Sequence, residues 1–313
     1  MTTEVSAKLA RKLSAESTVL LKNDNVLPIK PGQKIAVIGL ADTDNALTHA
    51  GGSGEVTPSF IATPLSSIKA QLPGATITYD DGKDSAKVCY RPAPPPTPSQ
   101  PYLSMRATAH GAFSALSAPQ AAAAAKAADV AIVFVGTLSS EGSDRKSLSL
   151  DDGGPMSTQN ALIEAVAAAQ PESVVVLSVP GAILCPWSGK VKAILTNFMP
   201  GQQAGNAIAD VLLGKVNPSG KLPLTFPNKE DEVEFAPDQW PGLPDPKNPT
   251  YANYTEELLV GYRYYDAHKI EFTTGYPFGH GSEPARALAS RPTYSLPSAC
   301  ILDCCPPATA ASD

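Results

Sequence analysis

The side chain in this sequence best placed to do chemistry is the carboxylate of Glu141, in the run Ser-Ser-Glu-Gly-Ser-Asp-Arg that ends at Arg145. It follows Val130–Gly136, an apolar run with the composition of a buried strand. It should therefore lie at that strand's carboxyl end, where open α/β sheets bind their ligands. The small residues around Glu141 leave room for its carboxyl group to approach a bound molecule. On position alone, a solvated surface acid remains the default interpretation.

Asp144 and Arg145 follow in the same loop. An arginine beside a carboxylate can form a bidentate pair that fixes the shape of a loop. The bland alternative is a surface ion pair, which contributes little to stability. Neither residue is predicted to be catalytic, and both alternatives stay open.

A glycine-rich stretch, Gly51–Gly54, follows the first apolar strand predicted, Lys34–Gly39. A phosphate-binding loop is a poor explanation, because the full Gly-x-Gly-x-x-Gly pattern is missing and Pro58 comes before any helix. An ordinary flexible turn is the simplest alternative.

Other reactive residue types show no functional spacing. Trp187 follows a predicted strand and is expected to pack in the core rather than to stack on a ligand. The histidines and cysteines lack the spacing of a metal site, so no metal or organic cofactor is implied. These residues are His49, His110, His268 and His280, with Cys89, Cys185, Cys300, Cys304 and Cys305.

Alternating strand and helix patterns must position these groups, and they predict an α/β fold: a layered sandwich with a mostly parallel sheet flanked by helices. The predicted strands are Lys34–Gly39, Thr76–Asp80, Val130–Gly136, Ser173–Val179 and Val191–Asn197, with a weaker one at Lys221–Phe226. The predicted helices are Pro64–Gln71, Pro119–Ala128, Met156–Ala169 and Gln202–Leu213. An amphipathic helix is predicted near the N-terminus from Val5, Leu9, Leu13 and Leu20.

Composition shifts divide the chain further. Residues 88–119 are rich in proline and are expected to form a surface loop. Residues 228–281 are rich in proline, tyrosine and acidic residues, and the run Tyr262, Tyr264 and Tyr265 is expected to be extended. Residues 282–313 lose all periodicity and are expected to be a divergent, disordered tail.

Charge and hydropathy exclude some classes of function. The 313 residues carry a net charge of −6, which argues against nucleic acid as a partner, because phosphate binding needs a basic patch. There is no run of 18 apolar residues to span a membrane, and residues 1–22 lack the apolar region of a secretory signal. Localisation stays open.

Several motifs, taken in order, resemble the second domain of the family 3 glycoside hydrolases. Any one motif alone is weak, but their order and spacing over roughly three-quarters of the chain make the match specific. The motifs are Glu16–Pro28, Lys34–Gly39, Gly51–Pro58, Thr63–Leu65, Ala128–Gly136, Ser140–Arg145, Pro186-Trp187, Pro200–Gly205, Asn217–Pro227, Gly261–Asp266 and Pro277–Gly281.

The resemblance implies a role for each candidate residue. Family 3 glucosidases similar to this chain carry their acid/base in the same Glu-Gly-x-Asp-Arg context, which assigns that role to Glu141. The glycine-rich loop is then expected to line a sugar cleft, with Gly52, Ser53, Gly54, Asp144 and Arg145 contacting substrate. The implied activity is that of a retaining β-glucosidase, which uses two carboxyl groups about 5–5.5 Å apart.

The resemblance also implies missing parts. The family's nucleophile is an aspartate on a (β/α) barrel, and the chain contains no Ser-Asp-Trp motif. We therefore expect residues 1–22 to be a linker helix from a barrel domain, residues 23–227 to be the sandwich domain, and residues 228–281 to lead toward a fibronectin-III-like domain. Gln203 and Ala204 replace the family's frequent Glu and Gly, and Val179 replaces a small or polar residue.

Two other classes remain. A sandwich without its barrel would be a non-catalytic carbohydrate-binding or interaction remnant. A flavodoxin-like nucleotide-binding domain is suggested only by sheet topology and the glycine loop, and fold analogy of that kind is a poor guide to function.

Overall fold

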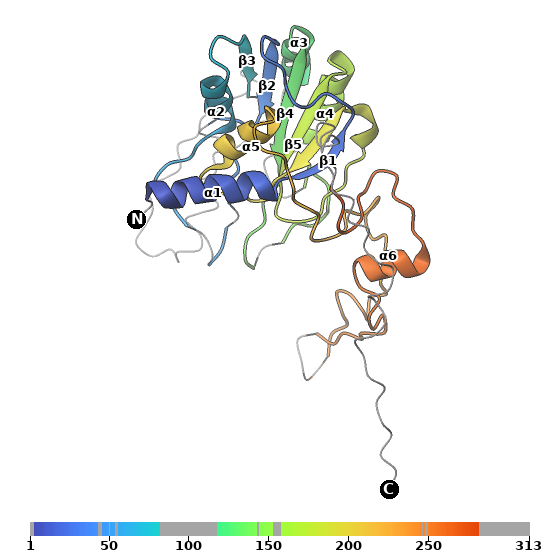
Figure 1. Ribbon diagram of the computed structural model, residues 1–313. Coiled ribbons are helices and arrows are strands. Elements are labelled where there is room, and N and C mark those ends of the chain that lie inside the picture. The colour runs from blue at the N-terminus through green and yellow to red at the C-terminus, as the bar shows by residue number, and fades with distance from the viewer. Residues whose placement is uncertain are drawn as a thin grey trace, which may run out of the picture.

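The computed structural model describes residues 3–42, 46–49, 51–53, 56–81, 118–142, 144–152, 158–245, 247 and 250–281. A six-stranded sheet in the order β1-β6-β5-β4-β2-β3 forms its centre (Figure 1). The strands are β1 (Val19–Asn23), β2 (Ile35–Gly39), β3 (Ile77–Asp80), β4 (Val130–Gly136), β5 (Ser173–Ser178) and β6 (Ala193–Thr196). The helices are α1 (Glu4–Ser17), α2 (Pro64–Gln71), α3 (Ala118–Lys126), α4 (Gln159–Ala169), α5 (Ala204–Leu212) and α6 (Tyr262–His268), with a 3₁₀ turn, η2, at Ser188–Lys190.

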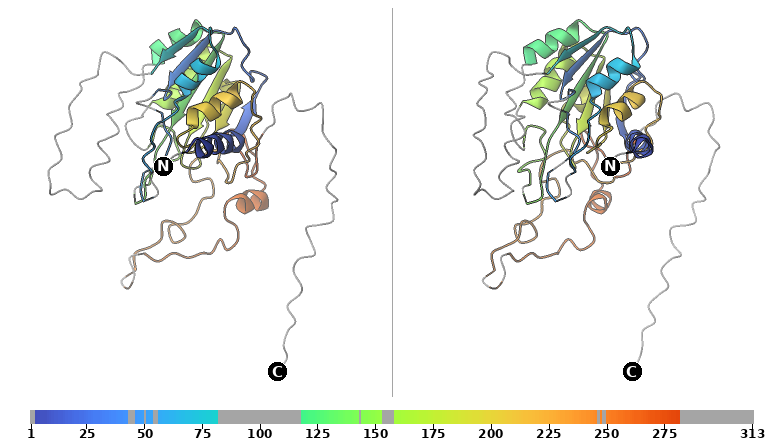
Figure 2. Two further views of the ribbon diagram at one scale, coloured as in Figure 1. Left: turned by 60° about the vertical axis from the view of Figure 1, so that its left-hand side comes forward. Right: turned by 90° about the vertical axis from the view of Figure 1, so that its left-hand side faces the viewer.

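Helices cover both faces of the sheet, which confirms the predicted layered α/β sandwich. In Figure 2, α1, α2 and α5 lie on one side of the strands and α3 and α4 on the other. Alternate strand residues divide between the two faces, as the pleat requires. In β4, Val130, Ile132 and Phe134 join the core under α1, α2 and α5, whereas Ala131, Val133 and Val135 join the core under α3 and α4. Burial on both faces explains why these strands are apolar without alternation.

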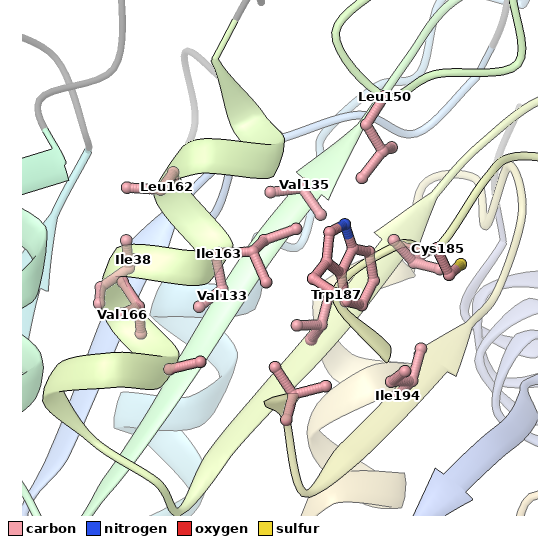
Figure 3. Close-up of a cluster of buried hydrophobic side chains, with 14 of the residues drawn as sticks. Ile38, Val133, Val135, Leu150, Leu162, Ile163, Val166, Cys185, Trp187 and Ile194 are labelled. Carbon is pink, nitrogen blue, oxygen red and sulfur yellow. The ribbon is translucent and has the colours of Figure 1, made fainter. Parts of the chain in front are cut away.

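Trp187 belongs to the second of these cores, as predicted. It is fully buried among apolar side chains from β4, β6 and α4 (Figure 3). Its indole Nε1 donates to Asn160 Oδ1 at 2.8 Å, which satisfies the ring's one polar atom. Trp187 therefore has a structural role, because it fills the core between α4 and the sheet.

The first strand was missed by the sequence analysis. α1 ends at Ser17 rather than continuing through Leu20, and β1 then pairs antiparallel with β6, starting at Val19 and Thr196. At the turn between α1 and β1, the Thr18 hydroxyl donates to Ser14 O at 2.9 Å. The β-branched Val19 favours the extended conformation, and Leu20 is buried in the sheet.

α1 is attached to α5 by charge rather than by its leucines. Arg11 donates through Nε and Nη2 to the two carboxylate oxygens of Asp210, each at 2.6 Å. Val5, Leu9 and Leu13 are instead 77%, 55% and 57% exposed, so the predicted apolar face is open to solvent. The spacing predicted a helix correctly but not the face that it buries.

Two expectations for the later part of the chain were wrong. Lys221–Phe226 forms no strand: only Phe226 pairs, in an isolated bridge with Tyr276, and Pro223 can donate no ladder hydrogen bond. Tyr262, Tyr264 and Tyr265 form helix α6, outside the two helical layers in Figure 1, instead of an extended run. This helix places Tyr265 against Phe272, with ring centroids 5.3 Å apart.

Asn228 ties the segment around α6 together. Its Oδ1 accepts from the backbone N–H groups of Thr273, Thr274 and Gly275 at 2.7–3.1 Å. The carboxylate of Glu232 accepts from Asn228 N at 2.9 Å and from the Tyr265 hydroxyl at 2.8 Å. Burial and the hydrogen bond to Glu232 raise the pKa of Tyr265 well above its usual range, so it donates as a neutral phenol.

Some predictions lie outside the described residues. They include the tail at 282–313 and most of the proline-rich stretch 88–119, of which Ala118 and Pro119 are described and begin α3. Within the described ranges, no helix is long and apolar enough to cross a membrane. The same ranges contain no cluster of three or more potential metal ligands.

The Arg11–Asp210 pair predicts a stability effect. Arg11→Ala leaves the buried Asp210 carboxylate without its guanidinium and should lower the free energy of unfolding by about 1–3 kcal/mol, discounted because Arg11 itself is partly exposed. Lys8→Ala removes an exposed pair with Glu4 and is the matched control, with an expected change within about 0.5 kcal/mol. Urea unfolding of the two variants measures the difference, and equal losses would contradict the assignment.

Gly205 predicts a packing effect at the start of α5. A Cβ there would lie 2.1 Å from the backbone of Thr63, and Gly205 N already donates to Ala62 O at 2.7 Å. Gly205→Ala should therefore destabilise the fold by about 1–3 kcal/mol through overpacking. Gly189→Ala, with no atom within 4 Å of its added Cβ, is the control and should be nearly neutral in thermal unfolding.

Candidate active site

The candidate site lies where the order of the strands reverses. From β2 the chain passes through α2 to β3 on one side, and then crosses to β4 on the other side of β2. Because β2 and β4 are parallel neighbours, the loops that follow them start next to each other at the carboxyl ends of the strands. This is the crevice where open α/β sheets bind ligands.

The two loops touch at this edge. Gly51 forms a parallel bridge with Ser140, and Gly51 N donates to Ser139 O at 3.3 Å. Ser53 N then donates to Glu141 Oε2 at 2.8 Å, and the Ser53 hydroxyl donates to the same oxygen. The structure thus brings together three of the predicted site residues, Gly52, Ser53 and Glu141, whereas Gly54 lies outside the described residues.

Glycine is required where the loops cross. Gly52 has a φ of +109°, and a Cβ there would lie 2.6 Å from the Cβ of Glu141. At Gly51 an added Cβ would lie 2.8 Å from Ser140 Oγ. The glycines therefore allow one loop to approach the carboxylate that the other carries, which is a local reason for this composition.

The hydrogen bonds from Ser53 lower the pKa of Glu141 below its ordinary value, with the hydroxyl contributing most and the backbone amide next. The side chain is exposed, and its slight burial opposes the shift only weakly. In this chain Glu141 is thus an ionised carboxylate at neutral pH, ready to accept a proton. To donate one, it must first be surrounded by something that raises its pKa, such as burial or a neighbouring anion.

Arg145, unlike the exposed Glu141, is partly enclosed by the protein. It is half-buried, and its Nη2 donates to Ala182 O at 3.0 Å, so it holds the loop to the segment after β5. Burial lowers its pKa, and the charges of Asp152, Glu230 and Asp144 oppose that effect. Asp144 itself is exposed, three residues after Glu141. The bond from Arg145 to the Ala182 carbonyl is a different contact from the bidentate carboxylate pair predicted above, and it ties the loop to another segment of the chain.

A second anchor of this loop was not found from the sequence. Glu230 Oε1 accepts from the Ser147 hydroxyl at 2.8 Å and from Leu148 N at 2.6 Å. Asp152 Oδ2 accepts from Ser147 N at 2.6 Å. Glu230 lies in a polar stretch far along the chain, and nothing in its local sequence distinguishes it from a solvated acid.

A shallow hollow, with room for little more than a water molecule, lies at the carboxyl ends of the strands. Its lining is mostly apolar, including Leu40, Leu47 and Phe134, and its polar residues are Ser178 and Asn197. None of the predicted site residues lines it. A sugar needs several hydrogen-bonding partners, so the contact between Ser53 and Glu141 defines the candidate site better than this hollow does.

Comparison with known proteins identifies the family of the chain. Residues 18–282 match the glycosyl hydrolase family 3 C-terminal domain, so the chain belongs to this family. It is 39% identical over 287 residues to the thermostable beta-glucosidase B of Acetivibrio thermocellus, covering 88% of this chain and 32% of that protein. It is 34% identical to an exo-alpha-(1->6)-L-arabinopyranosidase of Bifidobacterium longum, covering 88% of this chain and 33% of that protein.

The fold is also similar to that of a solved beta-glucosidase. The crystal structure of DesR, a beta-glucosidase from Streptomyces venezuelae in complex with D-glucose, aligns with a TM-score of 0.71 at 26% identity, covering 89% of this chain and 45% of that chain. The chain spans about a third of the length of the two curated relatives named above.

The crossing of the loops predicts the effect of Gly52→Ala. The new Cβ cannot fit beside the Cβ of Glu141, so the carboxylate should move away from Ser53 while the sheet stays intact. Gly74→Ala is the control, because Gly74 has a similar positive φ of +86° but nothing within 4 Å of an added Cβ. Crystal structures of both variants test this: an unmoved Glu141 in Gly52→Ala would contradict it.

Proposed function

We propose that this chain supplies the acid/base half of a retaining β-glucosidase site, with Glu141 as the acid/base and a (β/α) barrel domain supplying the nucleophile. The observation that carries the proposal is the position of Glu141: an exposed carboxylate at the topological switch point, held by the glycine-rich loop of the neighbouring strand. Membership of the family and the names of its relatives support the reaction class.

In the first step the carboxylate nucleophile of the barrel attacks the anomeric carbon, and protonated Glu141 gives its proton to the departing glycosidic oxygen. In the second step ionised Glu141 takes a proton from water, whose oxygen attacks the anomeric carbon and releases the nucleophile. A nucleophile about 5–5.5 Å away would raise the pKa of Glu141 by like-charge repulsion, and a bound sugar would add desolvation. Both effects oppose the hydrogen bonds of Ser53.

Substrate contacts are proposed for the exposed groups around Glu141. Gly52, Ser53 and Asp144 lie on the two loops that meet after β2 and β4. Arg145 instead ties the second loop to the segment after β5 through its bond to Ala182 O. The relative that is 39% identical is named a beta-glucosidase, and the aligned crystal structure is of a beta-glucosidase in complex with D-glucose. We therefore propose glucose as the released sugar and leave the partner across the bond unassigned.

The test joins this chain to a barrel. In a chimera, it replaces the corresponding domain of the Acetivibrio thermocellus β-glucosidase, and hydrolysis of an aryl β-glucoside is measured. Glu141→Ala should lower kcat about 10²–10⁴-fold, and azide should restore part of the rate, because this small anion attacks the glycosyl–enzyme without needing a base. The appearance of glucosyl azide identifies that step.

The control is Glu172→Ala, which should leave the rate unchanged. Glu172 is an exposed carboxylate just before β5, at the amino ends of the parallel strands. A Glu141→Ala chimera as active as its parent would overturn the catalytic assignment. Sugar binding without turnover in the parent chimera would favour the alternative, a carbohydrate-binding remnant.

A further inference from the structure

We propose that Ser53 is a positioning residue for Glu141: the glycine-rich loop holds the ionised carboxylate by two hydrogen bonds to one oxygen and thereby fixes its orientation and favours its basic form. This inference rests on the proposed function, because it gives Ser53 a role in acid/base chemistry only if Glu141 performs that chemistry. It replaces direct sugar binding as the main task of Ser53.

Both donors of Ser53 converge on the same atom. The backbone N–H and the hydroxyl meet at Glu141 Oε2, and Oε1 receives neither of them. A carboxylate held in this way cannot rotate freely, and the oxygen that exchanges protons with a substrate is then Oε1. Two donors on one oxygen also stabilise negative charge more than a single donor would.

The surrounding backbone is arranged to make this contact. The bridge between Gly51 and Ser140 fixes the two loops two residues before Ser53 and one residue before Glu141. The positive φ of Gly52 then turns the chain so that Ser53 N faces the carboxylate of Glu141. The backbone of the two loops thus places Ser53 against Glu141.

Both donors can stay in place when the carboxylate takes up a proton. The proton binds Oε1, and Oε2 is then the carbonyl oxygen of a neutral carboxyl, which can still accept from the Ser53 hydroxyl and backbone N–H. Both hydrogen bonds are stronger to the anion than to the neutral group, so they favour the ionised form. The arrangement favours the base step of a retaining cycle while still allowing the acid step.

Other charged groups lie on the same two loops. The loop after β2 carries Asp42 and His49, and the loop after β4 carries Asp144 and Arg145. Among the described residues the causes that lower the pKa of Glu141 are the two hydrogen bonds of Ser53, and no charge of these neighbours is among them. Removing the Ser53 hydroxyl should therefore act on Glu141 directly.

The experiment measures the ionisation of Glu141 in this chain by itself. The protein is labelled with ¹³C at glutamate side-chain carboxyls and titrated by NMR, and Glu141→Gln assigns the signal. Ser53→Ala removes the larger of the two stabilising contacts, so the titration midpoint of the Glu141 carboxyl should shift to higher pH. The backbone amide of residue 53 still donates to the carboxylate and limits the size of that shift. Ser53→Thr keeps the hydroxyl and should leave the midpoint near that of the parent.

Ser66→Ala is the matched control, because Ser66 lies on α2 and bonds to Thr63. Its Glu141 midpoint should equal that of the parent. An unchanged or lower midpoint in Ser53→Ala, or a Ser53→Thr midpoint that shifts as far as that of Ser53→Ala, overturns the inference. The titration needs no barrel and no substrate, so a failed azide experiment would overturn the proposed function and would be distinguishable from a failure here.

Discussion

The parallel pairing of β2 with β4 is the constraint on which the rest of the site depends. Its register places Ile35 opposite Val130 and Gly39, the last residue of β2, opposite Phe134, so both strands end at the same side of the sheet and β4 continues to Gly136. The loops that follow must therefore start side by side, although they lie far apart in the sequence. Every contact of Glu141 described above depends on this register, because a shift of one residue would exchange the side chains of β4 between the two cores and displace the loop that carries Glu141.

Much of the fold could be predicted because the strands carry their own signal. The runs at β2, β4 and β5 are apolar and β-branched, which requires burial on both faces, and the position of Glu141 follows from the end of β4. The edge strand β1 could not be predicted, because Leu20 continues a helical spacing and only its pairing with β6 makes it a strand. The pairing of Arg11 with Asp210 and that of Ser53 with Glu141 are fixed by tertiary structure, which local pattern does not encode.

The site combines a precise scaffold with an open environment. Glu141 is held on one side by the hydroxyl and the backbone amide of Ser53, and its side chain is otherwise exposed. An exposed carboxylate with two donors is a poor acid at neutral pH, and the change to a good one has to come from groups that approach its open side. The described residues therefore fix the direction of the carboxylate. In the proposed function, its ability to give a proton depends on the barrel domain and the bound sugar.

The pairing of β1 with β6 has a consequence for how the chain folds during synthesis. Val19 leaves the ribosome before its partner Thr196, which follows after a stretch of chain that takes on the order of ten to thirty seconds to make at bacterial and eukaryotic speeds. During that interval the apolar Val19–Leu21 has no partner strand to pair with. The nascent chain thus exposes an apolar strand with unpaired backbone groups, which favours aggregation, until β6 emerges. Of the six strands, β1 waits longest for its partner.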